Sequence, residues 1–516
     1  MKYLKVGLSI GLAFLTTHQF ANAQTNSNLN PNIKAGPGPA IKPMPVASNV
    51  KVVQIPANIT LDDAITIAVR QNPQILLAIQ QIEQTRGQII TVRAEALPLV
   101  ALSGVYSQVD PRLIGSSSSS SGNSGSTTTT SSSSTAVGAD KTWNISVTAT
   151  QLLYSGGQVG AAIKIAKLTL DSNYFNLRDV IDQTISNVYQ QYYTVLLDRE
   201  LIAVQQESVG LLQSQLNDQK NRFAAGTVPR FNVLQAEVAL SNQIPLLINA
   251  KNQYVISQTT LAQTLGIDYD IWRPDTGKVK VVGNLDVHYR EVNEDQAIAM
   301  ARARRAFLKV QRQSILIQLQ QIKVALAGYQ PTLTADGGYK VGSSPFSDKL
   351  DDTVNGWFVG VNGNWNIWDS GATYGRVKTA RAQLESAKAT YDAAVLTVNL
   401  QVQQAIANLK EARETIQSQV ENVKEALEAV RLAQERLAAG AGVQLDVLNA
   451  QVALEQARTN ELQSRHDYNV ALAQLDYAIG ADTQYVDGFE DPLTHRKPFA
   501  ANPDNKTSTA KISPKD

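Results

Sequence analysis

The sequence has no cysteine and only four histidines in 516 residues. Disulfides, cysteine-based metal sites and thiol catalysis are therefore excluded. It also lacks an excess of charge of either sign, with 46 Lys and Arg against 45 Asp and Glu, so no nucleic-acid partner is implied. No triad spacing, phosphate loop or metal-ligand cluster occurs in the pattern. We therefore expect neither an enzyme nor a metal or cofactor site.

Long apolar runs are missing as well. Beyond the N-terminus no run of about 18 apolar residues occurs, which excludes a helix that spans a bilayer. At the N-terminus, Lys2 and Lys5 precede an apolar stretch over 6–15, and the small residues of 21–23 have the form of a cleavage site. This pattern predicts a signal peptide over 1–23. An exported chain without a membrane helix is either soluble or a β-barrel.

The main feature that the sequence does have is a duplication. FAAGTVPRFNVLQAEVAL at 223–240 recurs as LAAGAGVQLDVLNAQVAL at 437–454, with nine of eighteen positions identical. The offset of 214 residues holds without a gap from 153 to 266. Upstream it becomes 233, and the difference is about the length of the Ser/Thr-rich tract at 116–135. A repeat of this length indicates two halves of one pseudo-symmetric body rather than a solenoid.

Each copy predicts a helix, a strand pair, a long helix, a turn and a returning helix, in that order. Helical periodicity begins near Thr60 and Asn293 and stops at Pro98 and Pro331. Over 380–430, apolar or small residues recur every three or four positions, as in a coiled-coil seam. In both copies Ala-Ala-Gly ends the long helix, and the chain turns back into a helix of about 35 residues.

Between the first and second helix of each copy the apolar period changes to two. Segments 143–151, 332–341 and 357–367 alternate apolar with polar residues, and a fourth near 99–109 alternates less cleanly. Strands of about ten residues with this pattern match tilted transmembrane strands around a wet lumen. A half-buried soluble sheet fits the alternation alone equally well. In lipid, a four-stranded sheet would have two unpaired edges, which three copies would remove by closing a twelve-stranded barrel.

These segments define the predicted organisation. The ranges are a signal peptide over 1–23, a disordered Pro/Asn-rich leader over 24–57, repeat 1 over 58–270 with its strand pair in 97–153, a linker midway along the helices over 271–292, repeat 2 over 293–482 with its strand pair in 331–368, and a C-terminal tail over 483–516. The predicted fold class is mainly α with a small β part. Each chain would contribute four strands to a trimeric, twelve-stranded transmembrane β-barrel, continued by a long antiparallel α-helical coiled-coil barrel.

These motifs together resemble the outer membrane efflux protein family, the TolC-type channel-tunnels, over roughly 60–482. The resemblance depends on the strand-end motifs at 154–157 and 368–371, on the duplicated turn followed by Asn232-Val-Leu and Asp446-Val-Leu, and on the closing Leu-Gly and Ile-Gly pairs. It implies a homotrimer in the outer-membrane lipid with a periplasmic helical tunnel. It also implies a periplasmic adaptor and a proton-driven or ATP-driven inner-membrane pump as partners, and export of drugs, other small molecules or secreted proteins.

The resemblance places the narrow tunnel entrance at the start of the returning helices. Asp446 matches the first of the family's entrance aspartates, whereas Asn449 stands at the next acidic position and Asn232 at the repeat 1 position. A trimer would then have one acidic ring, with three Asp446 carboxylates forming a negative constriction. The alternative is an aspartate that only stabilises the helix dipole. Arg230 is either a salt-bridge partner that holds the entrance shut or a solvated surface residue.

Two turns and two strand-to-helix junctions are further candidates. The turns are expected to contact the tip of the adaptor, a role that is compatible with ordinary helix-capping glycines. The aromatic residues of the junctions belong either to a membrane-interface girdle or to a structural core. The family often places proline shortly before that aromatic, where this chain has Leu152 and Asn366. The turn residues are Gly226, Thr227, Gly440 and Ala441, and the junction residues are Tyr154, Gly156, Gly157, Trp368 and Gly371.

Two other protein classes explain part of the pattern. A soluble periplasmic coiled-coil adaptor or scaffold would account for the heptads and the signal, but not for four amphipathic strands at matched positions of both repeats. A general diffusion porin would require many strands and few helices. The sequence does not identify the exported substrate.

Overall fold

The computed structural model describes residues 58–109, 141–267, 280–344 and 350–481. All of them belong to one compact unit, Val53–Asp516. The predicted signal peptide, the leader, the Ser/Thr-rich loop, the first part of the linker and the C-terminal tail lie outside the described residues.

Each repeat begins with two helices where the sequence predicts a single one ending at Pro98 or Pro331, so that prediction is wrong. In repeat 1 the break falls at Asn72, because Pro73 lacks an N–H and disfavours helical backbone at the residue before it. Asn72 then caps the next helix by accepting the N–H of Gln74 at 2.8 Å. In repeat 2 the break falls at Arg305, whose side chain is buried. The four helices are α1 (Leu61–Gln71), α2 (Pro73–Ala94), α5 (Glu294–Arg304) and α6 (Ala306–Leu326).

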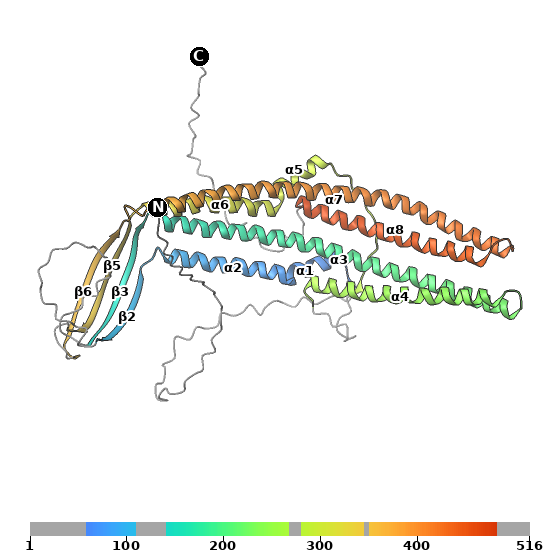
Figure 1. Cartoon of the computed structure of the whole chain (residues 1–516), viewed down its shortest axis with the longest axis horizontal. Coiled ribbons are helices and arrows are strands. Elements are labelled where there is room, and N and C mark those ends of the chain that lie inside the picture. The colour runs from blue at the N-terminus through green and yellow to red at the C-terminus, as the bar shows by residue number, and fades with distance from the viewer. Residues whose placement is uncertain (1–57, 110–140, 268–279, 345–349, 482–516) are drawn as a thin grey trace, which may run out of the picture. The chain divides into compact units, whose positions relative to one another are not determined.

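One antiparallel sheet contains strands from both repeats in the order β2-β3-β5-β6 (Figure 1). Its register collects the alternating apolar residues of β3, β5 and β6 on one face, together with Leu102 and Tyr106 of β2, because paired residues point the same way from a sheet. One row across this face reads Leu102, Val147, Tyr339 and Trp357, all of them exposed. The adjacent row reads Ser103, Ser146, Lys340 and Gly356 and belongs to the polar face. The strands are β2 (Leu99–Gln108), β3 (Lys141–Ser155), β5 (Thr332–Ser343) and β6 (Thr353–Asn364).

Two helical hairpins follow the strands. α3 and α7 each contain 67 residues, a length of about 100 Å. The returning helices α4 and α8 contain 36 residues each and therefore cover only about half of their partners. The bounds are α3 (Gln158–Ala224), α4 (Arg230–Leu265), α7 (Ala372–Ala438) and α8 (Gln444–Ile479).

The helices pack in the same lateral order as the strands. Near the sheet, α2 packs on α3, α3 on α6 and α6 on α7. Toward the hairpin ends, α4 packs on α3, α3 on α8 and α8 on α7. In both parts, repeat 1 supplies one lateral edge and α7 supplies the other. None of the helices in the described ranges combines the length and apolarity that crossing a membrane requires.

The main cores lie where the short helices meet end to end along α3 and α7. One core joins α1 to α3 and α4 around residues such as Ile65, Val195 and Leu261. The other joins α5 to α7 and α8 around Val398, Tyr468 and Leu475. Two short strands, β1 (Asn58–Ile59) and β4 (Lys280–Val281), form a parallel pair. The part of the predicted linker that follows β4 lies against this middle region, where the Oη of Tyr468 accepts the N–H of Arg290 at 2.9 Å.

Candidate channel entrance and strand-to-helix junctions

The two predicted adaptor-contacting turns have the same hydrogen-bond pattern. The N–H of Thr227 donates to the carbonyl of Arg222 at 2.9 Å, and the N–H of Ala441 donates to Arg436 at the same distance. Gly226 (φ 78) and Gly440 (φ 75) supply the left-handed backbone that this helix end requires. A Cβ at either glycine would meet no atom within 4 Å. The requirement for glycine is therefore conformational, and the turn surfaces are open.

Asp446 lies in the first turn of α8 and is exposed. Its carboxylate accepts the N–H of Val443 at 3.4 Å and so caps the N-terminus of α8. The capping contact supplies the structural role that the sequence left open as an alternative. It is compatible with an entrance role, because capping occupies one oxygen and leaves the carboxylate in solvent.

The other predicted entrance residues are only partly brought together. Arg230 is exposed as the first residue of α4 and pairs with no carboxylate in the described ranges, while Asn232 is half-buried. Asn449 lies on the wall of a cavity of about 280 Å³ between the two hairpins, which Gln243 and Glu455 also line. Their roles at an entrance stay predictions.

A polar network between the two hairpins was not predicted from the sequence. Glu455 of α8 accepts hydrogen bonds from Gln205 at 2.9 Å, from Gln243 at 3.0 Å and from Ser208. Nearer the hairpin ends, the side chain of Gln219 donates to that of Gln444 at 3.2 Å. Both contacts join repeat 1 to α8. A helical pattern can reveal such residues only as polar positions on an otherwise apolar stripe.

At the junctions, glycines open both long helices in left-handed backbone. Gly157 (φ 83) precedes α3 and Gly371 (φ 86) precedes α7. Gly156 is under a second constraint, since a Cβ there would lie 2.6 Å from the Cβ of Gln330. Its counterpart in repeat 2 is Ser370, the one non-glycine residue with positive φ (54) in the described part of the chain.

The two junction aromatics differ in their surroundings. Tyr154 is part of β3 and its hydroxyl donates to the side chain of Gln330 at 3.4 Å. Trp368 is 85% exposed, which removes it from any core of this single chain. Exposure of this degree favours an interface role over the structural-core alternative, but its place in a membrane girdle stays a prediction.

A buried ionic cluster lies between the repeats at the break of α5 and α6. Arg305 is 4% exposed, donates to the backbone carbonyl of Tyr477 and lies 3.6 Å from the centre of that ring. Its Nε is 4.0 Å from Asp179 of α3. Burial raises the pKa of Asp179, and the Arg305 charge opposes this. Burial likewise raises the pKa of Asp182 to about 6, against the stabilising charge of Arg178 at 3.1 Å.

The family model described as outer membrane efflux protein matches residues 64–267 and 297–481, most of both repeats. The chain belongs to the outer membrane efflux protein family. The chain is 25% identical over 397 residues to Protein CyaE of Bordetella pertussis, covering 76% of this chain and 78% of CyaE. It is 23% identical over 349 residues to the outer membrane efflux protein BepC of Brucella suis, covering 66% and 73%.

Solved structures support the same fold. The chain is similar to the Campylobacter jejuni CmeC outer membrane channel, with a TM-score of 0.67, 16% identity and coverage of 83% of this chain and 88% of that one. The predicted fold class and family are confirmed. As a member of this family, the chain is an outer-membrane channel protein with its helices in the periplasm.

Proposed function

We propose that three copies of the chain close into one export channel. The observation that carries this proposal is the shared lateral order of strands and helices. In the described chain, β2, α2 and α4 lie at one edge, while β6 and α7 lie at the other. A head-to-tail contact between unlike edges closes a ring when the rotation between copies fits. Because the order is the same in both layers, a single rotation joins β6 to β2 and α7 to α2 and α4.

The sheet supports closure in lipid. Within the described strands, β2 and β6 each pair along one side only, so their outer backbone groups have no partner in a single chain. The bilayer interior offers none either, and such edges must pair with another copy. The apolar row through Leu102 and Trp357 would face lipid, while the polar row through Ser103 and Lys340 would face the lumen. Three copies give the twelve-stranded barrel.

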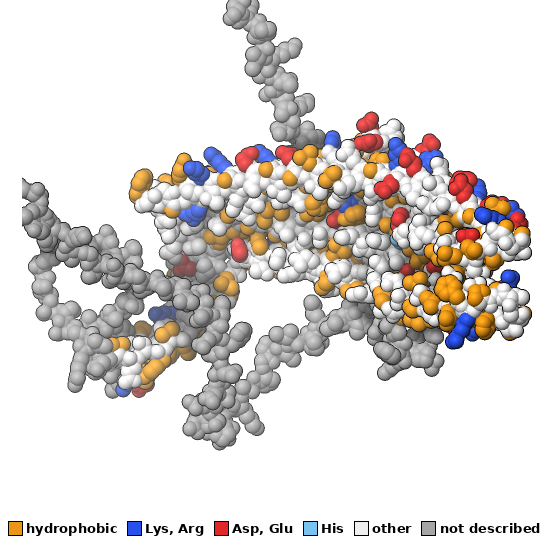
Figure 2. Space-filling view, turned by 45° about the vertical axis from the view of Figure 1, so that its right-hand side comes forward, with side chains coloured by type: hydrophobic (Ala, Val, Ile, Leu, Met, Phe, Trp, Pro, Cys, Tyr) orange, Lys and Arg blue, Asp and Glu red, His pale blue; other side chains and the backbone are white. Residues whose placement is uncertain are grey.

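The helical edges differ in chemistry. Figure 2 shows apolar side chains gathered over the end of the α3–α4 hairpin, where Phe231, Leu234 and Val238 are exposed. Acidic and basic side chains alternate along the α7 edge, where Arg431 pairs with Glu428 and Glu435. In the proposed ring the aliphatic parts of these long α7 side chains cover the neighbour's apolar α4 edge, and their charged ends remain in solvent.

The channel would export small molecules or secreted proteins from a complex with a periplasmic adaptor and an inner-membrane pump. The turns at Gly226 and Gly440 would receive the adaptor tips, since their surfaces are open. Three exposed Asp446 side chains would line the entrance, with Asn449 one turn further along α8. Arg230 and Asn232 would lie beside this entrance on the α3–α4 hairpin of the same chain.

Fractionation and conductance test this proposal. The full chain, produced with its N-terminus intact, should partition with the outer membrane and run as an oligomer of three chains that separates on heating. The purified oligomer should give discrete conductance steps in a planar lipid bilayer. A monodisperse, water-soluble monomer without conductance would overturn the proposal and favour the soluble scaffold instead.

A further inference from the structure

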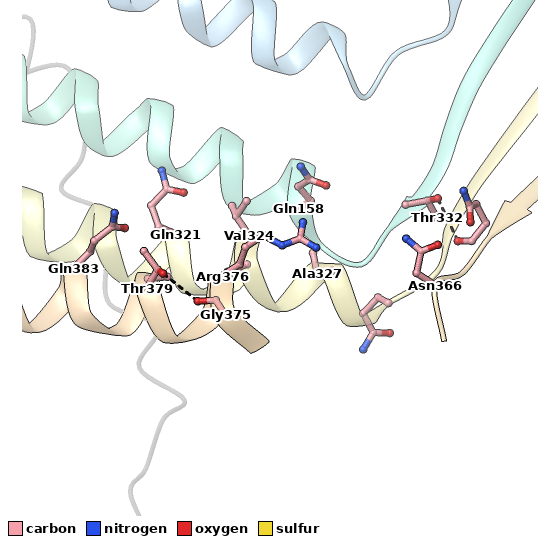
Figure 3. Close-up of a pocket in the computed structure, with 15 residues that line it drawn as sticks. Gln158, Gln321, Val324, Ala327, Thr332, Asn366, Gly375, Arg376, Thr379 and Gln383 are labelled. Carbon is pink, nitrogen blue, oxygen red and sulfur yellow. Dashed lines mark hydrogen bonds between the residues drawn. The ribbon is translucent and has the colours of Figure 1, made fainter. Parts of the chain in front are cut away.

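A polar cavity lies at the junction of the sheet and the helices of repeat 2. Its volume is about 630 Å³, and α3, α6, β5, β6 and α7 all contribute to its wall (Figure 3). Amide, hydroxyl and guanidinium side chains dominate the lining, and one of its residues is charged. The polar side chains are Gln158, Gln321, Gln330, Thr332, Asn364, Asn366, Arg376, Thr379 and Gln383.

The cavity opens on the polar face of the sheet. Thr332 pairs with Asn364 in the sheet and both line the cavity. By the alternation of a strand, they point to the same side as Asp336 and Asn362, whose side chains hydrogen-bond to one another. This is the face opposite the apolar row of Val147, so in the proposed channel the cavity faces the lumen and not the lipid.

The full polar lining is not a requirement of the fold, because repeat 1 builds the same junction with fewer polar side chains. At five lining positions repeat 2 has a polar residue where repeat 1 has an aliphatic one. The pairs, repeat 2 first, are Gln330 and Leu97, Thr332 and Leu99, Asn366 and Leu152, Arg376 and Ala162, and Thr379 and Ile165. Three other positions, Gln321, Asn364 and Gln383, are polar in both repeats. The difference therefore calls for a role other than joining strands to helices.

Arg376 is the centre of this difference. Its side chain is 63% exposed and lies among the lining residues in Figure 3. One nitrogen donates to the hydroxyl of Thr373 at 3.0 Å, and the nearest carboxylate, Asp369, is 3.7 Å away. That carboxylate is already used to cap α7, accepting the N–H groups of Gly371 at 3.1 Å and Thr373 at 2.7 Å. The Nε of Arg376 donates to the carbonyl of Ala372 at 3.5 Å. The remaining guanidinium N–H groups are thus left to meet a solute.

We propose that this cavity is a subsite that binds small anionic solutes, of the carboxylate class, as they pass through the channel. The inference rests on the proposed function, which brings three copies of Arg376 around one lumen. Guanidinium and amide N–H groups together suit a carboxylate, because charge-assisted hydrogen bonds are stronger than neutral ones. On the same polar face, the charges of Asp336 and Lys340 cancel one another. The net charge of this surface therefore stays positive, as the three copies of Arg376 make it.

The test is the block of single-channel current by citrate in bilayers of zwitterionic phosphatidylcholine, where no anionic headgroup competes. Arg376→Ala, which copies repeat 1, should raise the blocking constant for citrate about ten-fold. Lys378→Ala is the matched control, since Lys378 is an exposed cation two residues further on the same helix and has a lysine counterpart in repeat 1. Its blocking constant should stay that of the wild type.

Asp369→Ser, also the repeat 1 residue, separates binding from an ordinary structural ion pair. If Arg376 binds the solute, removing its carboxylate neighbour should leave the citrate block unchanged or strengthen it. If Arg376 serves only to hold Asp369, the two variants should lower the heat stability of the oligomer alike and leave the block unchanged, and the inference is overturned. A wild type without conductance instead overturns the proposed channel, which makes the two failures distinguishable.

Discussion

The side chain of Gln219 donates to that of Gln444 at 3.2 Å, and both residues are more than nine-tenths buried. The contact joins the last part of α3 to the first turn of α8, and so joins repeat 1 to repeat 2 close to the predicted entrance. The remaining oxygen of Gln219 and nitrogen of Gln444 have no partner among the described residues. A buried amide with one of its two polar atoms unpaired already lowers stability. Removing the one partner that it has lowers stability further.

Breaking this pair from one side should destabilise the hairpin ends. Gln219→Leu leaves the Gln444 amide buried without its partner, so we expect a loss of about 1–3 kcal/mol in unfolding free energy. The double variant with Gln444→Leu should recover most of that loss, because no amide then remains to be satisfied. Thermal unfolding followed by circular dichroism measures the cycle. Additive losses in the double variant would show that the two amides are not coupled.

The two junctions should respond in opposite directions to changes at equivalent positions. Gly156→Ala places a Cβ against Gln330 and strains a positive φ. We therefore expect the free energy of unfolding to fall by about 2 kcal/mol or more, and the melting temperature to fall with it. Ser370→Gly relieves a positive φ of 54° and should be neutral or stabilising by up to about 1 kcal/mol. Equal losses at both positions would contradict this difference between the repeats.

The buried carboxylate Asp182 should make stability depend on pH. Burial raises its pKa from 3.8 to about 6 in the folded chain, with Arg178 opposing the shift. A raised folded pKa means that the folded state binds more protons, so this contribution is full below pH 3.8 and is lost as the pH rises through about 6. The melting temperature of Asp182→Asn, which mimics the protonated acid, should vary less between pH 4 and pH 7 than that of the wild type. The exposed Asp218 on the same helix is the control, and Asp218→Asn should keep the wild-type slope.

The entrance proposal predicts how cations block the channel. Asp446→Asn removes the proposed acidic ring, so block by a multivalent cation such as hexaamminecobalt should weaken by about ten-fold in planar bilayers. Asn449→Asp restores the second acidic position of the family pattern and should strengthen block. If neither change alters block, Asp446 acts only as the helix cap seen in its contact with Val443.

The positions of the turn glycines could be predicted from the sequence because the backbone conformation that requires them is local. The Ala-Ala-Gly turns at Gly226 and Gly440 each need one residue with positive φ, and a glycine after a long periodic run identifies such a helix end without any knowledge of distant contacts. The strand alternation was readable for the same reason. Side chains of a strand point to opposite faces in turn, so the apolar row through Val147 and Tyr339 follows from the pattern once the strands pair.

The breaks between α1 and α2 and between α5 and α6 were not predicted from the sequence. Pro73 is a local signal for the first break, because the residue before a proline disfavours helical backbone, and the predicted helix ran past it. Arg305 offered none, because its conformation is held by a carbonyl and a ring of Tyr477, 172 residues away along the chain. A contact at that separation leaves no trace in a window of local periodicity.

The sequence by itself determined the duplication, the order of the strand pair and the long and returning helices in each copy, the two glycine turns and the family, because each depends on periodicity or on short motifs. Only the tertiary structure decided that strands and helices share one lateral order, that Gln219 meets Gln444, and that the lining of one junction around Arg376 forms a polar cavity. These relationships join residues that lie far apart along the chain, and packing in three dimensions alone brings them together.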